Sequence, residues 1–129
     1  MKNLEVTELS GQIVALHLQD YGDPTLRKWA RLKPRLLGSL PSDTHLRLLF
    51  DLRTAGYPEP DIMDRLLRDV YDARYALWRS TALLTVPTVL GWMERAAKRL
   101  PPGSREHVGV FLEEHRALAW LENRSSLPC

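Results

Sequence analysis

The sequence is poor in the features that cross-link, anchor or export a protein. It has one cysteine, Cys129, so it cannot form an internal disulfide. Its apolar runs extend over only a few residues, whereas a membrane-spanning helix needs about 20. The stretch from Met1 to Val6 lacks the apolar segment of a secretory signal. We therefore expect a cytoplasmic protein that makes no membrane contact.

The motifs that accompany catalysis, metals or nucleotides are also missing. The sequence has no Gly-rich phosphate loop, no nucleophile elbow, and no Cys-x2-Cys or His-x3-His pair. His107 and His115 stand eight positions apart, too far for one helix to present both to one metal ion. Glu113 and Glu114 precede His115 and offer a general base, but no nucleophile accompanies them in the sequence. We expect no enzymatic activity, metal, cofactor or small-molecule substrate.

Apolar residues repeat at helical spacing along most of the chain. The longest such pattern runs from Pro60 to Ala82, with Ile62, Leu66 and Val70 on one stripe, and it predicts a helix over residues 61–84. Further helices are predicted over residues 6–20, 24–33, 43–55 and 89–100, and from Ser104 onward. Residues 14–18 fit a strand as well as a helix. The run from Ala82 to Trp92 is apolar nearly all round and must be buried or form an interface.

These helices predict an all-α fold, a single-domain bundle of five or six helices with a long central helix. Apolar residues make up 44% of the chain and charged residues 26%, which is typical of a soluble globular domain. A chain of 129 residues suffices for one core. We expect a single helical domain over residues 1–129, with frayed ends at 1–5 and 125–129.

The segment from Leu46 to Leu67 has the pattern of a helix, a turn at Gly56 and a second helix. Its Leu-Arg-x-Ala-Gly-Tyr phrase, followed by Ile62 and Leu66, resembles segments of bacterial helix-turn-helix regulators. A second helix that reads DNA offers Arg, Asn, Gln or Ser near its start, but this one starts with Pro-Glu-Pro-Asp. We favour a structural αα-hairpin for this segment.

Positive charge gathers in one part of the chain. Residues 24–53 contain seven basic residues against two acidic ones, and five of these cations lie with Trp29 between Arg27 and Arg35. Clustered cations suit phosphates, and an exposed indole can stack on an unpaired base. The alternative is a solvated helix face with Trp29 turned into the core. The predicted nucleic-acid-binding residues are Arg27, Lys28, Trp29, Arg31, Lys33, Arg35, Arg47 and Arg53.

Our leading functional hypothesis is a small non-catalytic helical subunit of a larger bacterial or mobile-element nucleoprotein assembly. Its basic segment would contact RNA or single-stranded DNA, and its apolar helices would contact other protein subunits. In size, class and charge the chain is similar to small helical subunits of RNA-guided CRISPR-type complexes. Two alternatives stay open: a helix-turn-helix DNA-binding regulator, and a protein-only inhibitor or adaptor whose arginines contact acidic surfaces.

Overall fold

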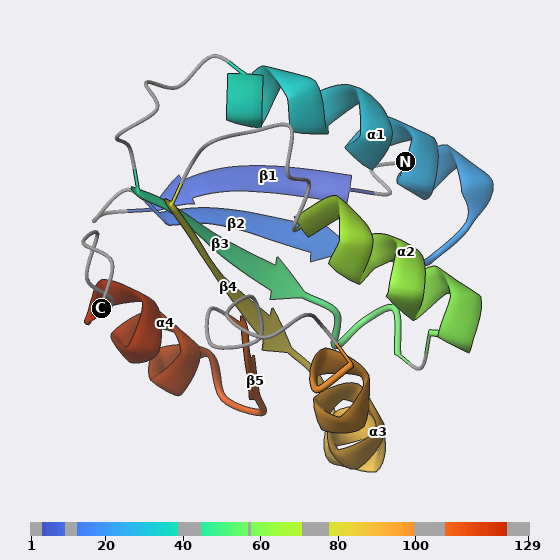
Figure 1. The fold of residues 1–129 in the computed structure, drawn as a ribbon, viewed down its shortest axis with the longest axis vertical. Coiled ribbons are helices and arrows are strands. Elements are labelled where there is room, and N and C mark those ends of the chain that lie inside the picture. The colour runs from blue at the N-terminus through green and yellow to red at the C-terminus, as the bar shows by residue number, and fades with distance from the viewer. Residues whose placement is uncertain are drawn as a thin grey trace.

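The computed structural model describes residues 4–9, 13–38, 45–56, 58–70, 78–99 and 108–123. Within them the chain forms five strands and four helices (Figure 1). The strands are β1 (Leu4–Leu9), β2 (Ile13–Leu18), β3 (His45–Asp51), β4 (Trp78–Leu84) and β5 (Val108–Phe111). The helices are α1 (Asp23–Gly38), α2 (Pro60–Val70), α3 (Pro87–Ala97) and α4 (Glu114–Glu122). The fold is α/β, so the expected all-α bundle is wrong.

The strands form one sheet in their chain order, β1-β2-β3-β4-β5. β1 and β2 are antiparallel and pair Leu9 with Ile13, whereas β2 to β5 run parallel. α1, α2 and α3 join the consecutive parallel strands. Because parallel crossovers are right-handed and each one steps in the same direction, these three helices must share one face of the sheet. Figure 1 shows them together there, with α4 on the opposite face.

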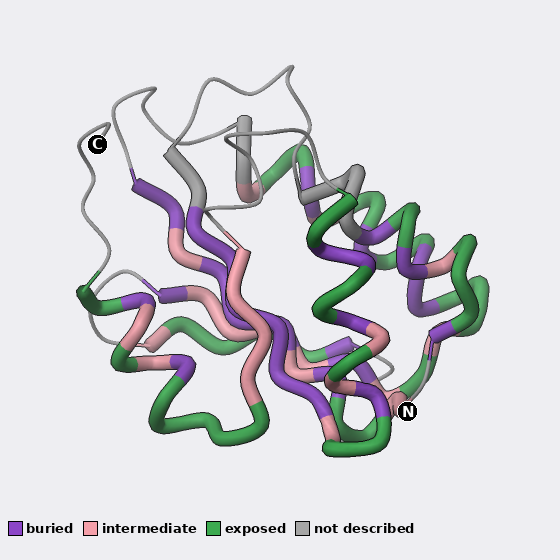
Figure 2. The backbone as a smooth tube through the Cα atoms, turned by 60° about the horizontal axis from the view of Figure 1, so that its bottom comes forward, coloured by how far each residue is buried: buried purple, intermediate pink, exposed green. Residues whose placement is uncertain are grey.

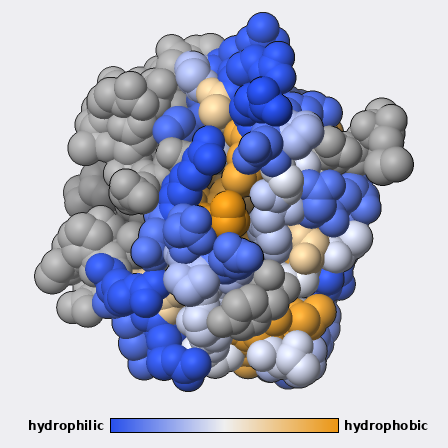
Figure 3. Space-filling view, turned by 90° about the vertical axis from the view of Figure 1, so that its right-hand side faces the viewer, coloured by the Kyte–Doolittle hydropathy of each residue, from blue (hydrophilic) through white to orange (hydrophobic). Residues whose placement is uncertain are grey.

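Two apolar cores result, one on each face of the sheet. The larger core lies under α1–α3 and combines strand residues such as Leu16 and Phe50 with Trp29 of α1 and Met93 of α3. The smaller core lies under α4 and includes Leu121 of that helix. Figure 2 shows buried positions along the central strands and, in the helices, alternating with exposed ones. From the right-hand side of Figure 1 the coloured surface is largely hydrophilic, with apolar residues showing in a central band and in a patch at the lower right (Figure 3).

β3 and β4 are strands in segments where we expected helices over residues 43–55 and 61–84. The central strands are buried on both faces: Leu48 belongs to the core under α1–α3, and its neighbour Leu49 belongs to the core under α4. A strand buried on both sides reads as a continuous apolar run, which also satisfies helical spacing. The expected long central helix is therefore wrong. Its first part is α2, and residues 71–77 lie outside the described part of the chain.

The predicted helix over residues 6–20 is wrong for a related reason. Leu9, Ile13 and Leu16 stand three or four positions apart, but they belong to two different strands. The strand considered for residues 14–18 is confirmed within β2. The last predicted helix is likewise divided, because β5 takes its middle and α4 its end. Two of the four β5 residues are valine, which favours a strand.

Several helix signals in the sequence are correct. α1 begins at Asp23, as the Asp23-Pro24 pair predicts. The sequence allows Pro34 either to end or to kink this helix near Lys33, and the end is wrong, because α1 continues through Pro34 to Gly38. Pro34 is exposed, so water can satisfy the carbonyl that loses its N–H partner there. The apolar spacing in residues 89–97 corresponds to α3.

The αα-hairpin, and with it the helix-turn-helix interpretation, is wrong because its first element is β3. Gly56 closes the turn between β3 and α2 instead of following a helix. Its φ is +80°, a range that favours glycine, and its N–H donates to the Leu52 carbonyl at 3.0 Å. The similarity to small helical CRISPR-type subunits rested on size, class and charge, and the sheet removes the shared all-α class.

Leu66 tests whether α2 packs on the sheet, because only 5% of its surface is exposed in the larger core. Leu66→Ala should lower the free energy of unfolding by about 2–5 kcal/mol, since it removes buried methyl groups and leaves a cavity. Urea titration followed by circular dichroism measures this change. The adjacent exposed residue provides a control, Arg65→Ala, which should change stability by less than about 0.5 kcal/mol. Equal effects of the two substitutions would contradict the packing of α2.

Candidate functional site

α1 packs against β1 and presents one side to the sheet. Thr25, Leu26 and Trp29 are buried on that side. An α-helix turns once every 3.6 residues, so the positions between them face outward, and many of these are basic. Four residues predicted from the sequence as a nucleic-acid site are exposed on α1: Arg27, Lys28, Arg31 and Arg35.

A groove of about 430 Å³ opens between α1 and β1, and we call it the basic groove. It is lined by three cations, Lys28, Arg31 and Arg35, and by two apolar side chains, Val6 and Leu32. Val6 is 43% exposed, so part of the apolar lining is open to solvent. The structure therefore brings three of the predicted site residues to one cavity.

Three of the exposed α1 cations donate to uncharged acceptors. Lys28 Nζ donates to the carbonyl oxygen of Leu4 at 2.8 Å. Arg27 Nε donates to the carbonyl of Asp23 at 3.4 Å, and Arg31 Nε donates to the carbonyl of Arg27 at 3.5 Å. Among the described residues, no carboxylate forms an ion pair with any of these three cations. Their charge is not cancelled in place, so the basic groove attracts anions.

Trp29 and Lys33 lie on the inner side of α1. Trp29 is 2% exposed, and its ring meets that of Phe50 edge-on, with centroids 5.2 Å apart and an interplanar angle of 85°. Its Nε1 has no hydrogen-bond partner within the described residues. An indole in this position cannot stack on a base that approaches from solvent. Lys33 is also buried, with 7% of its surface exposed.

Arg47 and Arg53 lie apart from the basic groove. Arg47 Nε donates to the carbonyl of Leu121 at 2.8 Å, which ties β3 to α4 on the opposite face of the sheet. Arg53 follows β3 and makes a two-pronged contact with Asp51, from Nε at 3.0 Å and from Nη2 at 2.9 Å. Both arginines therefore make hydrogen bonds within the fold. The structure does not bring them together with the α1 cations.

A second polar cluster lies at the carboxyl ends of β2 and β3, the edge at which open α/β sheets usually bind ligands. His17 Nε2 and Thr54 Oγ1 are 3.0 Å apart, and Asp51 is the β3 register partner of His17. Imidazole and hydroxyl groups at this distance resemble a base and a nucleophile. Sequence reasoning missed this contact because it joins residues 37 positions apart.

The Asp51 carboxylate accepts hydrogen bonds from Arg53 and, within the described residues, none from His17. Its Oδ1 accepts from the Arg53 backbone N–H at 3.2 Å and from Arg53 Nε, and Oδ2 accepts from Arg53 Nη2. Within the described residues no hydrogen bond joins Asp51 to His17, so no carboxylate orients the imidazole as a triad requires. Burial raises the pKa of Asp51, but the hydrogen bonds and charge of Arg53, together with the charge interaction with His17, outweigh it and hold that pKa below its ordinary value.

Other classes of site have little support in the described residues. No group of three or more His, Cys, Asp or Glu side chains there is arranged to hold a metal ion. None of the helices in that part of the chain is both long and apolar enough to cross a membrane. The chain matches no protein-family model and no curated protein. The basic groove and the His17–Thr54 cluster are two candidate arrangements within the described part of the chain.

Substitution of Trp29 tests whether this predicted site residue lies in the core. Trp29→Ala should cost about 3–5 kcal/mol of stability, because it empties a large volume in the core. Trp29→Leu keeps an apolar side chain and should cost less, so binding can be compared in a folded protein. Any affinity for single-stranded nucleic acid should then be unchanged. A folded Trp29→Leu variant that loses about fivefold or more would contradict the interior position, since that is the least a stacked aromatic contributes.

Arg53 tests the charge arrangement after β3. Arg53→Gln should raise the pKa of Asp51, because the carboxylate keeps its burial and loses its cation. A carboxyl group whose pKa is lower in the folded state than in the unfolded state stabilises the folded state. This stabilisation is complete above the pKa of the unfolded state, near 4, and it is lost as the pH falls through the pKa of the folded state. The wild type should therefore exceed the variant in stability at pH 7, and the difference should shrink below about pH 4.

Urea titrations at pH 7 and at about pH 3, with the Asp51 pKa followed by NMR, measure both effects. Arg116→Gln is the control, because Arg116 forms an exposed ion pair with Glu113 at 3.8 Å. That control should change stability little at either pH. A stability difference for Arg53→Gln that does not depend on pH would show that Arg53 contributes only packing.

Proposed function

We propose that this chain is a non-catalytic binding protein whose basic groove holds the phosphate groups of a nucleic acid. The observation that carries the proposal is the state of two cations: Lys28 and Arg31 line the groove and donate only to neutral carbonyls. Each phosphate that a cation neutralises releases condensed counterions, and this release supplies most of the sequence-independent affinity for nucleic acid.

The lining of the groove indicates the kind of contact. An arginine guanidinium forms forked hydrogen bonds with phosphate, so Arg31 and Arg35 are suited to the backbone. Among the described residues, the groove lining includes no aromatic side chain, and Trp29 is in the core. Binding through phosphates alone fixes the position of the partner without reading its sequence. We therefore expect RNA and DNA of different sequences to bind with similar affinity, with no preference that depends on base stacking.

The proposal assigns no reaction to the chain. The His17–Thr54 contact has the distance of a catalytic pair, but the carboxylate beside it is engaged by Arg53. We treat that cluster as a brace between β2 and the turn after β3. We also propose that the chain works beside other protein subunits, in a cytoplasmic nucleoprotein assembly.

A second candidate function uses the same groove for a protein. In that case the chain is an adaptor, and the groove takes an acidic segment of its partner. The observation that favours this candidate is the apolar lining, because Val6 is 43% exposed and Leu32 lies beside it. An apolar side chain of a peptide could cover these residues, and a phosphate backbone has no equivalent group.

The Lys28→Gln/Arg31→Gln variant tests the nucleic-acid proposal. Glutamine keeps helix propensity and removes charge, so α1 should stay folded. Binding to duplex DNA and to single-stranded RNA, measured by fluorescence anisotropy at several salt concentrations, should weaken for every sequence. The slope of log affinity against log salt should become shallower by about 1.8 for the duplex and about 1.4 for the single strand, if each cation contacts one phosphate.

Two further variants act as matched controls. Arg65→Gln removes an exposed cation from α2 and should leave affinity nearly unchanged. Glu8→Gln removes a carboxylate that shares a face of β1 with Val6, and it should strengthen binding. If the wild type binds neither duplex nor single strand at low salt, the nucleic-acid proposal is overturned. Retention of an acidic peptide by the same cations would then support the adaptor.

A further inference from the structure

The basic groove combines positive charge with apolar surface that is open to solvent. Val6 is the register partner of Leu16, which belongs to the core under α1–α3, so Val6 points toward α1. It lines the groove beside Leu32 and is nevertheless 43% exposed. A single exposed apolar side chain is common on protein surfaces, but this one lies inside a groove lined by cations. A ligand that carries an apolar group as well as negative charge would use both features of the groove.

The groove residues of α1 follow one stripe of the helix. Lys28, Arg31, Leu32 and Arg35 stand three or four positions apart, except that Arg31 and Leu32 are adjacent, so all four lie on the same side. At a rise of 1.5 Å per residue, the stripe from Lys28 to Arg35 is about 10 Å long. Leu32 therefore lies among the cations, with Val6 across the groove on β1. We call Val6 and Leu32 the apolar centre of the basic groove.

The size of the groove distinguishes a single strand from a duplex. Its volume of about 430 Å³ is in the lower part of the range of sites that hold one small molecule, about 300–1,000 Å³. A duplex, whose major groove alone is about 12 Å wide, touches the rim of such a groove and does not enter it. Its bases are also paired and stacked inside the helix. An unpaired base, in contrast, turns away from its own strand readily and can enter the groove.

We propose that the basic groove holds an unpaired nucleotide of a single strand, with its base on the apolar centre and the neighbouring phosphates on the α1 cations. This inference rests on the proposed function of the groove and specifies its ligand. A single strand brings one negative charge and one base with an apolar face in every unit, as a groove of cations around an apolar centre requires. Because every base has such a face, the contact tolerates any sequence. The phosphates still supply most of the affinity.

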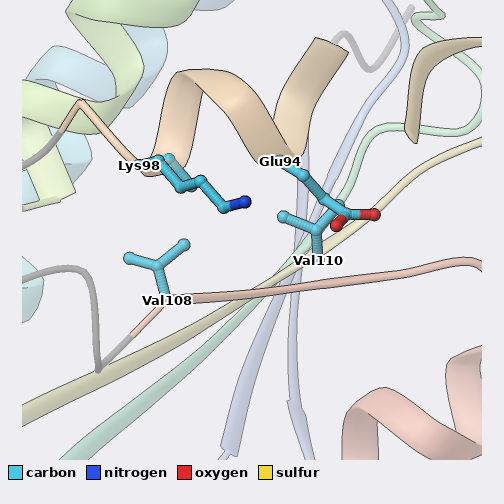
Figure 4. Close-up of a pocket in the computed structure, with 5 residues that line it drawn as sticks. Glu94, Lys98, Val108 and Val110 are labelled. Carbon is cyan, nitrogen blue, oxygen red and sulfur yellow. The ribbon is translucent and has the colours of Figure 1, made fainter. Parts of the chain in front are cut away.

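A second groove, between α3 and β5, provides an internal comparison. Its volume is about 310 Å³, and Val108, Val110 and Ala97 line it. The charged lining residues in the described part of the chain are Glu94 and Lys98, one of each sign (Figure 4). A carboxylate in the lining repels phosphate, so we expect no nucleic acid there. This groove therefore offers a valine in a similar setting for a control substitution.

Val6→Thr tests the base contact without removing a cation. Threonine has nearly the shape of valine and suits a strand, so β1 should stay folded, but a hydroxyl group replaces one methyl group of the apolar centre. Val6→Ile keeps the centre apolar and enlarges it. Val110→Thr places the same change in the groove between α3 and β5. Circular dichroism checks that each variant is folded.

Fluorescence anisotropy of the full chain measures affinity for three probes: a single-stranded DNA of mixed sequence, an abasic single strand of the same length, and a duplex. The wild type should bind the DNA strand about three- to tenfold more tightly than the abasic strand, because only the former has bases to cover the apolar centre. Val6→Thr should remove most of this preference, whereas Val6→Ile and Val110→Thr should keep it. Comparing two proteins with two strands separates the contact from any difference in strand flexibility.

Val6→Thr should leave duplex affinity and the salt dependence of every probe unchanged, because the phosphate contacts remain. Equal binding of the DNA and abasic strands by the wild type overturns the base contact and leaves the phosphate proposal intact. The same holds if Val6→Thr weakens all three probes equally. A wild type that binds no nucleic acid at low salt overturns both. Tighter binding of a leucine-containing acidic peptide, weakened by Val6→Thr, would assign the apolar centre to a protein partner and overturn the base contact.

Discussion

Burial of both faces of β3 and β4 is the constraint on which the rest of the molecule depends. Leu48, Leu49 and Leu84 are each no more than 1% exposed, and they divide between the two cores. A parallel sheet requires cover on both sides, and right-handed crossovers can supply only one layer when every step goes the same way. α4 provides the second layer. Full burial of one leucine is worth about 1.5–3 kcal/mol, which is a large fraction of the roughly 5–15 kcal/mol net stability of a typical domain.

The same constraint distributes the charges. α1 must turn Leu26 and Trp29 toward the sheet, so its cations take the outer side, beside β1. Burial of the Trp29 indole in the core is thus what places the α1 cations beside the basic groove. At the other edge, α3 reaches β5 with Glu94 and Lys98 on the rim of an apolar groove. The cations of α1 therefore gather beside one outer strand of the sheet, β1.

The sequence alone predicts the helices better than the strands. The Asp23-Pro24 pair, the stripe through Ile62 and Leu66, and the spacing in residues 89–97 each correspond to a helix. The sequence does not predict β3 and β4, because strands buried on both faces lack the apolar–polar alternation that identifies a strand. The exposed cations of α1 were predictable from local spacing. Contacts such as His17–Thr54, and the groove between α1 and β1, depend on strand order, which no local pattern contains.

NMR of the uniformly labelled chain tests the buried parallel sheet most directly. Backbone chemical shifts report strand or helix at each residue, and amide hydrogen exchange reports how much of the molecule must open. Residues 45–51 and 78–84 should show strand shifts, and amides in β3 and β4 should exchange only through global unfolding. Cross-strand contacts should join Leu49 to Ala82, which are paired in the β3–β4 register. Helical shifts over residues 45–51, or rapid exchange of these amides, would contradict a sheet buried between two helical layers.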